Sequence, residues 1–233
     1  MMSEDAKEKY VIAAVKPWFA EAYERRVGKR SDVFSYLENP DTLSLDLLDK
    51  IGPRFVFFTH WPTRVPSEIL NKYECVCFHM PELPSGRGGA PVQNLILRGH
   101  EETQVCALRM VEELDAGPIY LKRPLTITGK AGDIYSNLAD LVFDMIFNMI
   151  REKPTATPQT GLPSIFKRRK PADSELIKTG TDKDMYDHIR MVDAPTYPSA
   201  YLQWGEWVIE FSDACLTGSG GVISKVSIKK NKD

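Results

Sequence analysis

Three short apolar runs, each followed by a helix signal or a loop, constrain the fold of this chain most. The runs cover residues 10–15, 55–59 and 73–79, and their Val, Ile, Phe and Tyr content is typical of buried strands. Residues 18–27 have helical spacing, and shorter helices are expected at 43–48 and from residue 67. Buried strands that alternate with helices usually pair in parallel, so we predict an α/β fold with a mostly parallel sheet.

The second half of the chain begins with a constrained loop. Residues 80–91 contain three prolines and three glycines, which excludes regular structure, and a helix should follow from Ala90. Strands are expected at 104–110 and 119–125. A single apolar stripe then predicts a long helix over 134–149, capped by Asp133.

After Pro154 the composition shifts to Thr, Pro and Gly. We therefore predict a main domain over residues 1–155, followed by a linker and a small C-terminal subdomain over 156–233. This subdomain should be α+β, with a helix at 182–192 capped by Thr181 and strands at 204–211 and 221–228.

Charge and hydropathy exclude several classes of protein. Lys and Arg number 30 against 32 Asp and Glu, so the net charge of −2 disfavours a protein that wraps nucleic acid. The absence of an eighteen-residue apolar run excludes a membrane span, and the charged N-terminus shows no secretory signal. Four cysteines without export indicate free thiols, so we expect a cytoplasmic protein with no membrane partner.

His79 and Asp115 are the first candidates for catalysis. His79 ends the third apolar run, and Asp115 lies in a turn that follows another strand. Ligands of parallel α/β sheets bind at the carboxyl ends of strands, and a His beside an Asp forms a general base with an orienting carboxylate. By residue type alone the pairing stays open, because a His and an Asp thirty-six residues apart are more often unrelated.

The sequence around these two residues is much more specific. From His79 to Gln93 it is His-Met-Pro-Glu-Leu-Pro-Ser-Gly-Arg-Gly-Gly-Ala-Pro-Val-Gln, and from Leu114 to Pro118 it is Leu-Asp-Ala-Gly-Pro. In order and spacing these motifs resemble the folate-dependent formyltransferase family, which includes methionyl-tRNA, glycinamide-ribonucleotide and amino-sugar formyltransferases. Residues 166–176 and 189–201 resemble later segments of the tRNA and amino-sugar enzymes. The resemblance thus covers about residues 55–201.

The resemblance implies a fold and a reaction. The fold would be a reduced Rossmann-like formyltransferase domain with a small C-terminal extension, its first half shorter than is usual in the family. The reaction would be formyl transfer from N10-formyltetrahydrofolate to an amine. His79 would be the base, Asp115 would hold it, and an Asn two residues before the His would donate a hydrogen bond to the formyl oxygen.

Cys77 stands where the family has this Asn, and a thiol is a poor donor. Three explanations stay open. Another donor, such as His60 or a loop amide, replaces it; the acyl group or reaction differs; or the protein binds without catalysis. A metal site formed by Cys75, Cys77 and His79 is disfavoured, because residues two apart on a strand are separated by roughly 6.6 Å.

The resemblance also implies binding residues. Those for the formyl donor are His60, Trp61, Pro62, Leu114 and Ile119, with Trp61 as a wall for the pterin ring. Those for the acceptor are Arg87, Gly88 and Gln93, with Arg87 meeting an anionic group.

Among acceptors, an amino-sugar nucleotide is favoured. Glycinamide ribonucleotide fits least, because the motif from Arg87 to Gln93 looks like the tRNA and amino-sugar branches. A tRNA acceptor would call for a full C-terminal barrel with a basic face, whereas only the short basic run Lys167–Lys170 precedes the C-terminal unit. A methionyl-tRNA formyltransferase, another acyl transferase and a binding module stay as alternatives, and a homodimer is left open.

Overall fold

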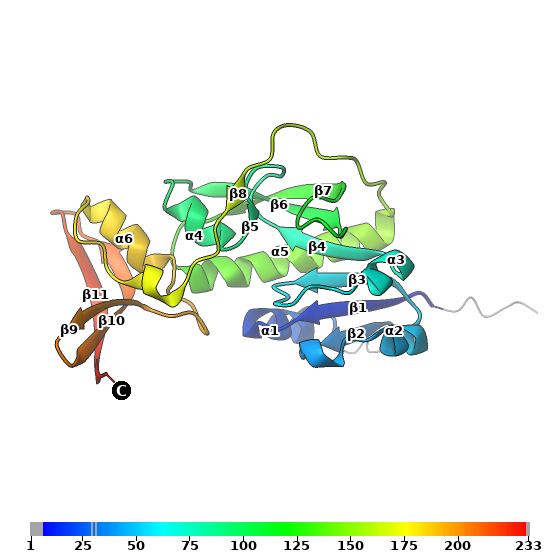
Figure 1. The fold of residues 1–233 in the computed structure, drawn as a ribbon, viewed down its shortest axis with the longest axis horizontal. Helices are drawn as coiled ribbons and strands as arrows, with labels where there is room; N and C mark the ends of the chain where they lie inside the picture. Colours follow the sequence, from blue (N-terminus) through cyan, green and yellow to red (C-terminus); the bar gives the residue numbers. More distant parts are fainter. Residues whose placement is uncertain (1–6, 29, 31, 232–233) are drawn as a thin grey trace, which may run out of the picture.

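The computed structural model describes residues 7–28, 30 and 32–231, and its centre is a six-stranded sheet in the order β2-β1-β3-β4-β6-β7 (Figure 1). The first four strands in this order are parallel, and β6 and β7 pair antiparallel. The mostly parallel α/β sheet is therefore confirmed. Its strands are β1 (Lys9–Ala14), β2 (Phe34–Leu37), β3 (Pro53–Thr59), β4 (Cys75–His79), β6 (Glu102–Arg109) and β7 (Ile119–Thr126).

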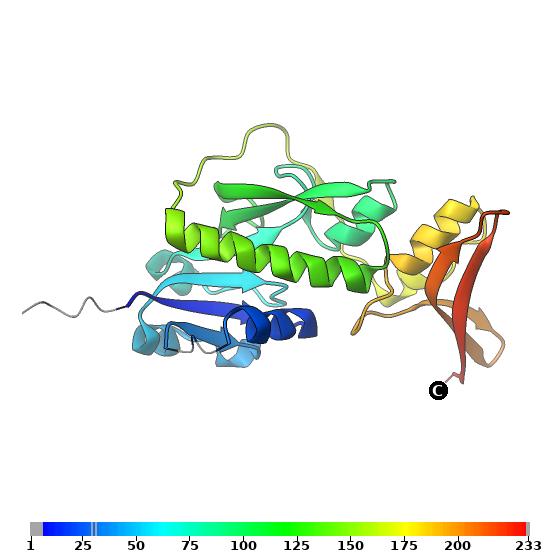
Figure 2. The ribbon, with the colours of Figure 1, turned by 180° about the vertical axis from the view of Figure 1, so that it is seen from behind.

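One face of the sheet is covered by α1 (Pro17–Arg26) and by α5 (Ala131–Glu152), which crosses it in Figure 2. The predicted apolar stripe of α5 is buried against the strands. The predicted cap is wrong, because α5 begins one turn earlier than expected, after Lys130. Asp133 lies in the first turn, where its charge favours the positive end of the helix dipole.

The opposite face has two different coverings. Over β1 and β3 lie α2 (Leu45–Ile51) and α3 (Ser67–Lys72), whose Leu48 and Ile69 pack on the strands. Over β4, β6 and β7 lie loops, and Leu83 from the first of them packs on Cys106, Leu108 and Ile119. We call these two regions the helix-covered half and the loop-covered half of this face.

The antiparallel pairing of β6 with β7 follows from the short connection between them. Only nine residues, 110–118, connect β6 to β7, which is too short for a crossover helix. Because β6 is antiparallel to β4, Arg109 lies beside Val76, and the Met110 N–H donates to the Cys75 carbonyl. The loop 110–118 therefore starts near the amino end of β4.

The C-terminal unit consists of α6 (Asp182–Arg190) and a three-stranded antiparallel sheet of β9 (Ala200–Trp204), β10 (Trp207–Leu216) and β11 (Val222–Lys230). Thr181 caps α6 as predicted. The single strand expected at 204–211 is wrong, because a two-residue turn at Gly205 and Glu206 separates β9 from β10. Gly205 has a φ of 57°, which suits such a turn.

Arg190 docks this unit on the main sheet. Its buried guanidinium pairs with Asp187 and donates to the carbonyls of Ile127 and Gly129. The unit lies at one end of α5 in Figure 1. The domain boundary after residue 155 stays a prediction. None of the helices in the described part of the chain combines the length and apolar character needed to cross a bilayer.

The remaining elements are short. They are α4 (Pro91–Ile96), the two-residue strands β5 (Arg87–Gly88) and β8 (Ile165–Phe166), and the 3-10 turns η1 (Pro40–Thr42) and η2 (Pro171–Ser174).

Candidate functional site

His79 is the last residue of β4, and its side chain is 9% exposed. Side chains alternate along a strand, so His79 lies with Cys75 and Cys77 on the face that is covered partly by α2 and α3 and partly by loops. The His79 Nε2 atom is 2.9 Å from the carbonyl oxygen of Gly86. A carbonyl only accepts, so Nε2 carries the hydrogen of this contact, and in that tautomer Nδ1 keeps a free lone pair.

Asp115 faces this lone pair, with its Oδ2 atom 3.6 Å from His79 Nδ1. The Gly88 N–H donates to the same oxygen at 2.9 Å. The expected juxtaposition of His79 and Asp115 is thus confirmed. The loop 110–118 leaves β6 near the amino end of β4 and folds back, so that Asp115 reaches His79 at the carboxyl end of β4.

Cys77 lies beside the pair but is not an activated thiol. Burial, and next the charge of Asp115, raise the pKa of the Cys77 thiol well above its usual value. The thiol is therefore neutral and a poor nucleophile. Within residues 7–28, 30 and 32–231, no group of three or more His, Cys, Asp or Glu side chains is placed to hold a metal ion.

Residues 157–166, which we call the strap, were predicted to be a linker but lie along both loops of the site. The Gln159 Nε2 group donates to the carbonyls of Asp115 and Gly117 at 2.7 and 2.8 Å. The Ser164 hydroxyl accepts from the Gly86 N–H at 2.8 Å, and β8 pairs with β5. The Thr, Pro and Gly content of this segment signals a loop, and nothing in it points to these contacts.

The predicted acceptor residues have other partners. Arg87 donates to Glu113 and to the Gln159 Oε1 atom, so its guanidinium braces the loops. Gly88 contacts Asp115 through its backbone. Gln93 is 2% exposed, and its amide donates to the Tyr135 hydroxyl and the Met191 carbonyl. The Gln93 amide therefore contacts buried polar groups of the core, and its assignment to the acceptor site stays a prediction.

The residues predicted to bind the formyl donor do not all lie on one face of the sheet. The His60 ring stands edge-on to the rings of Trp18, Phe19 and Tyr135, on the face covered by α1 and α5. Burial lowers the pKa of His60 to about 4, so the ring is neutral.

Trp61 packs edge-on against Phe58 and belongs to the apolar cluster of the opposite face, as Cys77 does. Pro62 is exposed, and Leu114 is 67% exposed on the loop 110–118. Ile119 is buried among Leu83, Cys106 and Leu108. His60 therefore lies on the opposite face from Trp61, whereas Trp61 and Ile119 share the face that carries His79, and the donor-binding assignment of these residues stays a prediction.

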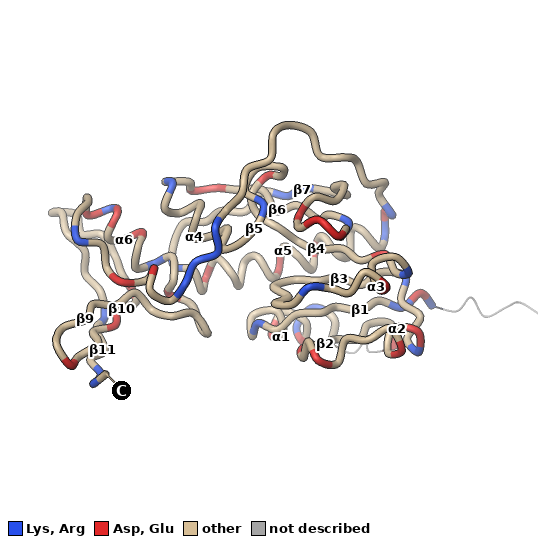
Figure 3. Tube along the Cα trace, in the orientation of Figure 1, with Lys and Arg blue, Asp and Glu red and all other residues tan. Residues whose placement is uncertain are grey.

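A basic run follows the strap. Lys167, Arg168 and Lys170 are exposed, and burial lowers the pKa of Arg169. Figure 3 shows this run as a continuous blue stretch beyond β8. Since β8 pairs with β5, the run places positive charge beside the loops of the site.

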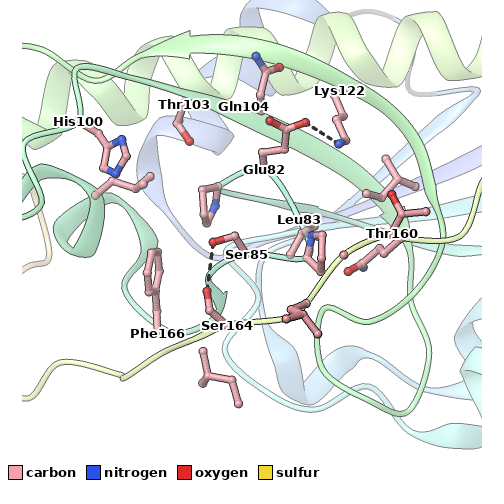
Figure 4. A pocket seen from close by; sticks show the side chains of 18 of the residues that line it. Glu82, Leu83, Ser85, His100, Thr103, Gln104, Lys122, Thr160, Ser164 and Phe166 are labelled. Atoms are coloured by element: carbon pink, nitrogen blue, oxygen red, sulfur yellow. Dashed lines mark hydrogen bonds and ion pairs between the residues drawn. The ribbon is translucent and has the colours of Figure 1, made fainter.

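A groove of about 1090 Å³ lies behind the first loop, between residues 81–85, strands β6 and β7, and the strap (Figure 4). The Glu82–Lys122 ion pair and the contact between the Ser85 and Ser164 hydroxyls lie at its walls. His79 and Asp115 are not among its lining residues. The groove is therefore separate from the paired His and Asp.

Comparison with known proteins identifies the family. A solved structure named methionyl-tRNA formyltransferase from Clostridium thermocellum superposes with a TM-score of 0.92 at 33% identity, over 96% of this chain and all of that one. The chain belongs to the formyltransferase family. Residues 171–229 match the model of the methionyl-tRNA formyltransferase C-terminal domain.

Other members of the family are more distant. A methionyl-tRNA formyltransferase from Pelotomaculum thermopropionicum is 29% identical over 198 residues, which are 79% of this chain and 63% of that protein. A sugar N-formyltransferase from Shewanella has a TM-score of 0.63 at 17% identity, over 94% of this chain and 96% of that one, and shares the fold. The chain spans about half to two thirds of the length of the curated relatives it matches.

Proposed function

We propose that this chain transfers the formyl group of N10-formyltetrahydrofolate to the primary amine of an anionic acceptor, with His79 as the general base. The observation that carries this proposal is the His79–Asp115 pair at the end of β4 in a formyltransferase fold. The Gly86 carbonyl holds the hydrogen of the ring on Nε2, which leaves Nδ1, 3.6 Å from the carboxylate, to accept a proton.

In this reaction His79 Nδ1 accepts the proton that the amine loses as its nitrogen bonds to the formyl carbon. The ring becomes an imidazolium, which the Asp115 carboxylate stabilises across 3.6 Å. The same proton then leaves His79 for the N10 nitrogen as the bond between N10 and the formyl carbon breaks. Such acid–base catalysis is worth on the order of 10²- to 10⁴-fold in rate.

N10-formyltetrahydrofolate supplies the activated formyl group when bound, and two residues fit it. Trp61 lies on the same face of the sheet as Cys77 and His79. Its buried indole N–H has no partner within the described residues, so it can donate to a ligand. The exposed Leu114 offers an apolar contact on the loop that carries Asp115. His60, on the other face, does not fit this role.

The position of His60 also bears on the missing Asn. His60 is wedged between the aromatic rings of the α1 and α5 face, so it is a poor candidate to replace the family donor beside Cys77. The neutral thiol of Cys77, the Trp61 indole N–H and the backbone amides of the loops are donors on the side of the sheet that carries His79.

For the acceptor we favour an amino-sugar nucleotide. The exposed basic run beside the site complements a diphosphate group. The lysines of the C-terminal sheet are already neutralised, because Lys225, Lys229 and Lys230 pair with Asp213, Glu210 and Glu206. That sheet therefore offers little free positive charge to an RNA backbone.

Methionyl-tRNA is the second candidate, and the comparisons favour it. The C-terminal unit matches the corresponding domain of methionyl-tRNA formyltransferases, and the structure that shares 33% identity carries that name.

The test is to incubate the protein with N10-formyltetrahydrofolate and either nucleotide-linked amino sugars or charged methionyl-tRNA, and to detect the N-formyl product by mass spectrometry. We expect formylation of an amino-sugar nucleotide, with weak salt dependence. Formylation of the tRNA alone, with kcat/KM falling steeply as salt rises, would replace the preferred acceptor by the second. No formylation of either would reject the proposed function.

A further inference from the structure

We propose that Gln159 is a positioning residue that holds Asp115 against His79, and that the strap sets the geometry of the pair. The kinetic part of this proposal rests on the proposed function, whereas its structural part does not. No bond is made or broken by Gln159 itself.

Gln159 uses both ends of its side-chain amide. The Nε2 group donates to two carbonyls of one loop, those of Asp115 and Gly117, at 2.7 and 2.8 Å. The Oε1 atom accepts from Arg87 at 2.9 Å, and Arg87 belongs to the loop that carries Gly86 and Gly88. One side chain thus ties the loop of Asp115 to the loop that contacts His79.

The loop 110–118 needs such a tie. Asp115 has a φ of 54°, a left-handed conformation that is unfavourable for residues other than glycine. Residues 111–114 are all exposed, so little apolar packing fixes the loop. A segment with few buried groups opens easily, and without Gln159 the Asp115 carboxylate would be free to leave His79.

The other end of the strap acts on His79. The Ser164 hydroxyl accepts the Gly86 N–H, and the Gly86 carbonyl fixes the His79 tautomer. Backbone pairing of β8 with β5 holds the same loop, since the Arg87 N–H donates to the Ser164 carbonyl. The strap therefore contacts the immediate support of both members of the pair.

The test compares Gln159→Met, which keeps the length of the side chain without its polar atoms, with Thr160→Ala, an exposed neighbour that leaves Gln159 in place. We expect Gln159→Met to lower kcat by about 10- to 100-fold with KM within about threefold, because misplaced groups slow the chemical step. Thr160→Ala should match the wild type.

A second readout needs no activity. The Gly88 N–H donates to Asp115 Oδ2, so its hydrogen exchange, followed by NMR, reports the position of the carboxylate. We expect exchange of the Gly88 amide to accelerate about tenfold or more in Gln159→Met, with strand amides unchanged. This measurement separates the two proposals, because it stands even if no acceptor is formylated.

Two further variants keep the inference open to rejection. Gln159→Glu retains the acceptor for Arg87 but cannot donate to the carbonyls, so it should lose kcat as Gln159→Met does even if the latter folds poorly. In an Asp115→Asn background, Gln159→Met should have little further effect on kcat, because it acts through Asp115. Full kcat and unchanged Gly88 exchange in both Gln159 variants would overturn the proposal.

Discussion

The two halves of the sheet face that carries His79 differ in what holds them. In the helix-covered half, α2 and α3 place Leu48 and Ile69 on the strands, and burial of apolar side chains stabilises the packing. In the loop-covered half, carbonyls, amides and the side chains of Gln159 and Ser164 fix loops of little regular structure. The candidate chemistry lies in this second half, where the backbone can approach a reacting group closely.

The largest expected effect belongs to the loop-covered half. His79→Asn removes the ring that accepts the proton, so we expect kcat/KM for formyl transfer to fall by on the order of 10³-fold. The fold should persist, because the side chain lies at the end of β4 and not in the apolar core. Thermal melting and steady-state kinetics check both points, and activity within threefold of wild type would remove His79 from the mechanism.

Substitution of one glycine in each half by alanine compares the two halves directly. An added Cβ at Gly86 would lie 2.6 Å from the Pro81 ring and 2.7 Å from the Phe166 ring, whereas Gly52, after α2, has nothing within 4 Å. Both have positive φ, so each substitution to Ala should cost about 1 kcal/mol of backbone strain. Gly86→Ala should also displace the carbonyl that orients His79 and lower kcat/KM by about 100-fold.

Gly52→Ala is the matched control and should keep its activity with a slightly lower melting temperature. Equal kinetic losses in the two variants would show that the distinction between the halves does not govern catalysis.

Cys77 lies where the two halves meet. If it merely occupies the place of the family Asn, Cys77→Asn should restore an amide donor and raise formyl transfer by roughly tenfold to a hundredfold. Cys77→Ala, which adds no donor, is the control. Full activity in Cys77→Ala with a loss in Cys77→Asn would show instead that the pocket is shaped around the thiol.

The smallest effect lies on the far side of the sheet and concerns stability. His60 has a pKa of about 4, lowered from 6.5 by burial, so the unfolded chain binds its proton more readily between these values. The stability that the neutral ring supports is present above about pH 6.5 and is lost as pH falls toward 4. His60→Asn should reduce this loss by about 2 kcal/mol, measured by urea unfolding at both pH values. An unchanged pH dependence would contradict the buried, neutral ring.

The same division explains what the sequence could predict. The unbroken apolar runs at 10–15 and 55–59 match strands buried on both faces, and the stripe of α5 follows the helical period, so these elements were found. The Leu-Asp-Ala-Gly-Pro turn located Asp115 through its resemblance to a family. The path of the loop 110–118 back along β4 could not be predicted, because the direction of β6 depends on tertiary pairing.

Gln159 and Gln93 show the limit most clearly. Gln159 lies in a Thr- and Pro-containing segment typical of a linker, and its role arises from two carbonyls more than forty residues away in sequence. Gln93 belongs to a motif associated with the acceptor, yet it is buried against Tyr135. Polar side chains that bind distant backbone groups leave no periodic signal.

The most direct test of this account is the tautomer of His79 in the wild-type protein, read from its ring ¹⁵N resonances by NMR at neutral pH. The account predicts that the tautomer with hydrogen on Nε2, donated to the Gly86 carbonyl, predominates over the one with hydrogen on Nδ1, the atom that lies 3.6 Å from Asp115. Loss of that signal in His79→Asn assigns it. A neutral ring with its hydrogen on Nδ1 would contradict the account, because the atom proposed to accept the proton of the amine would already carry one.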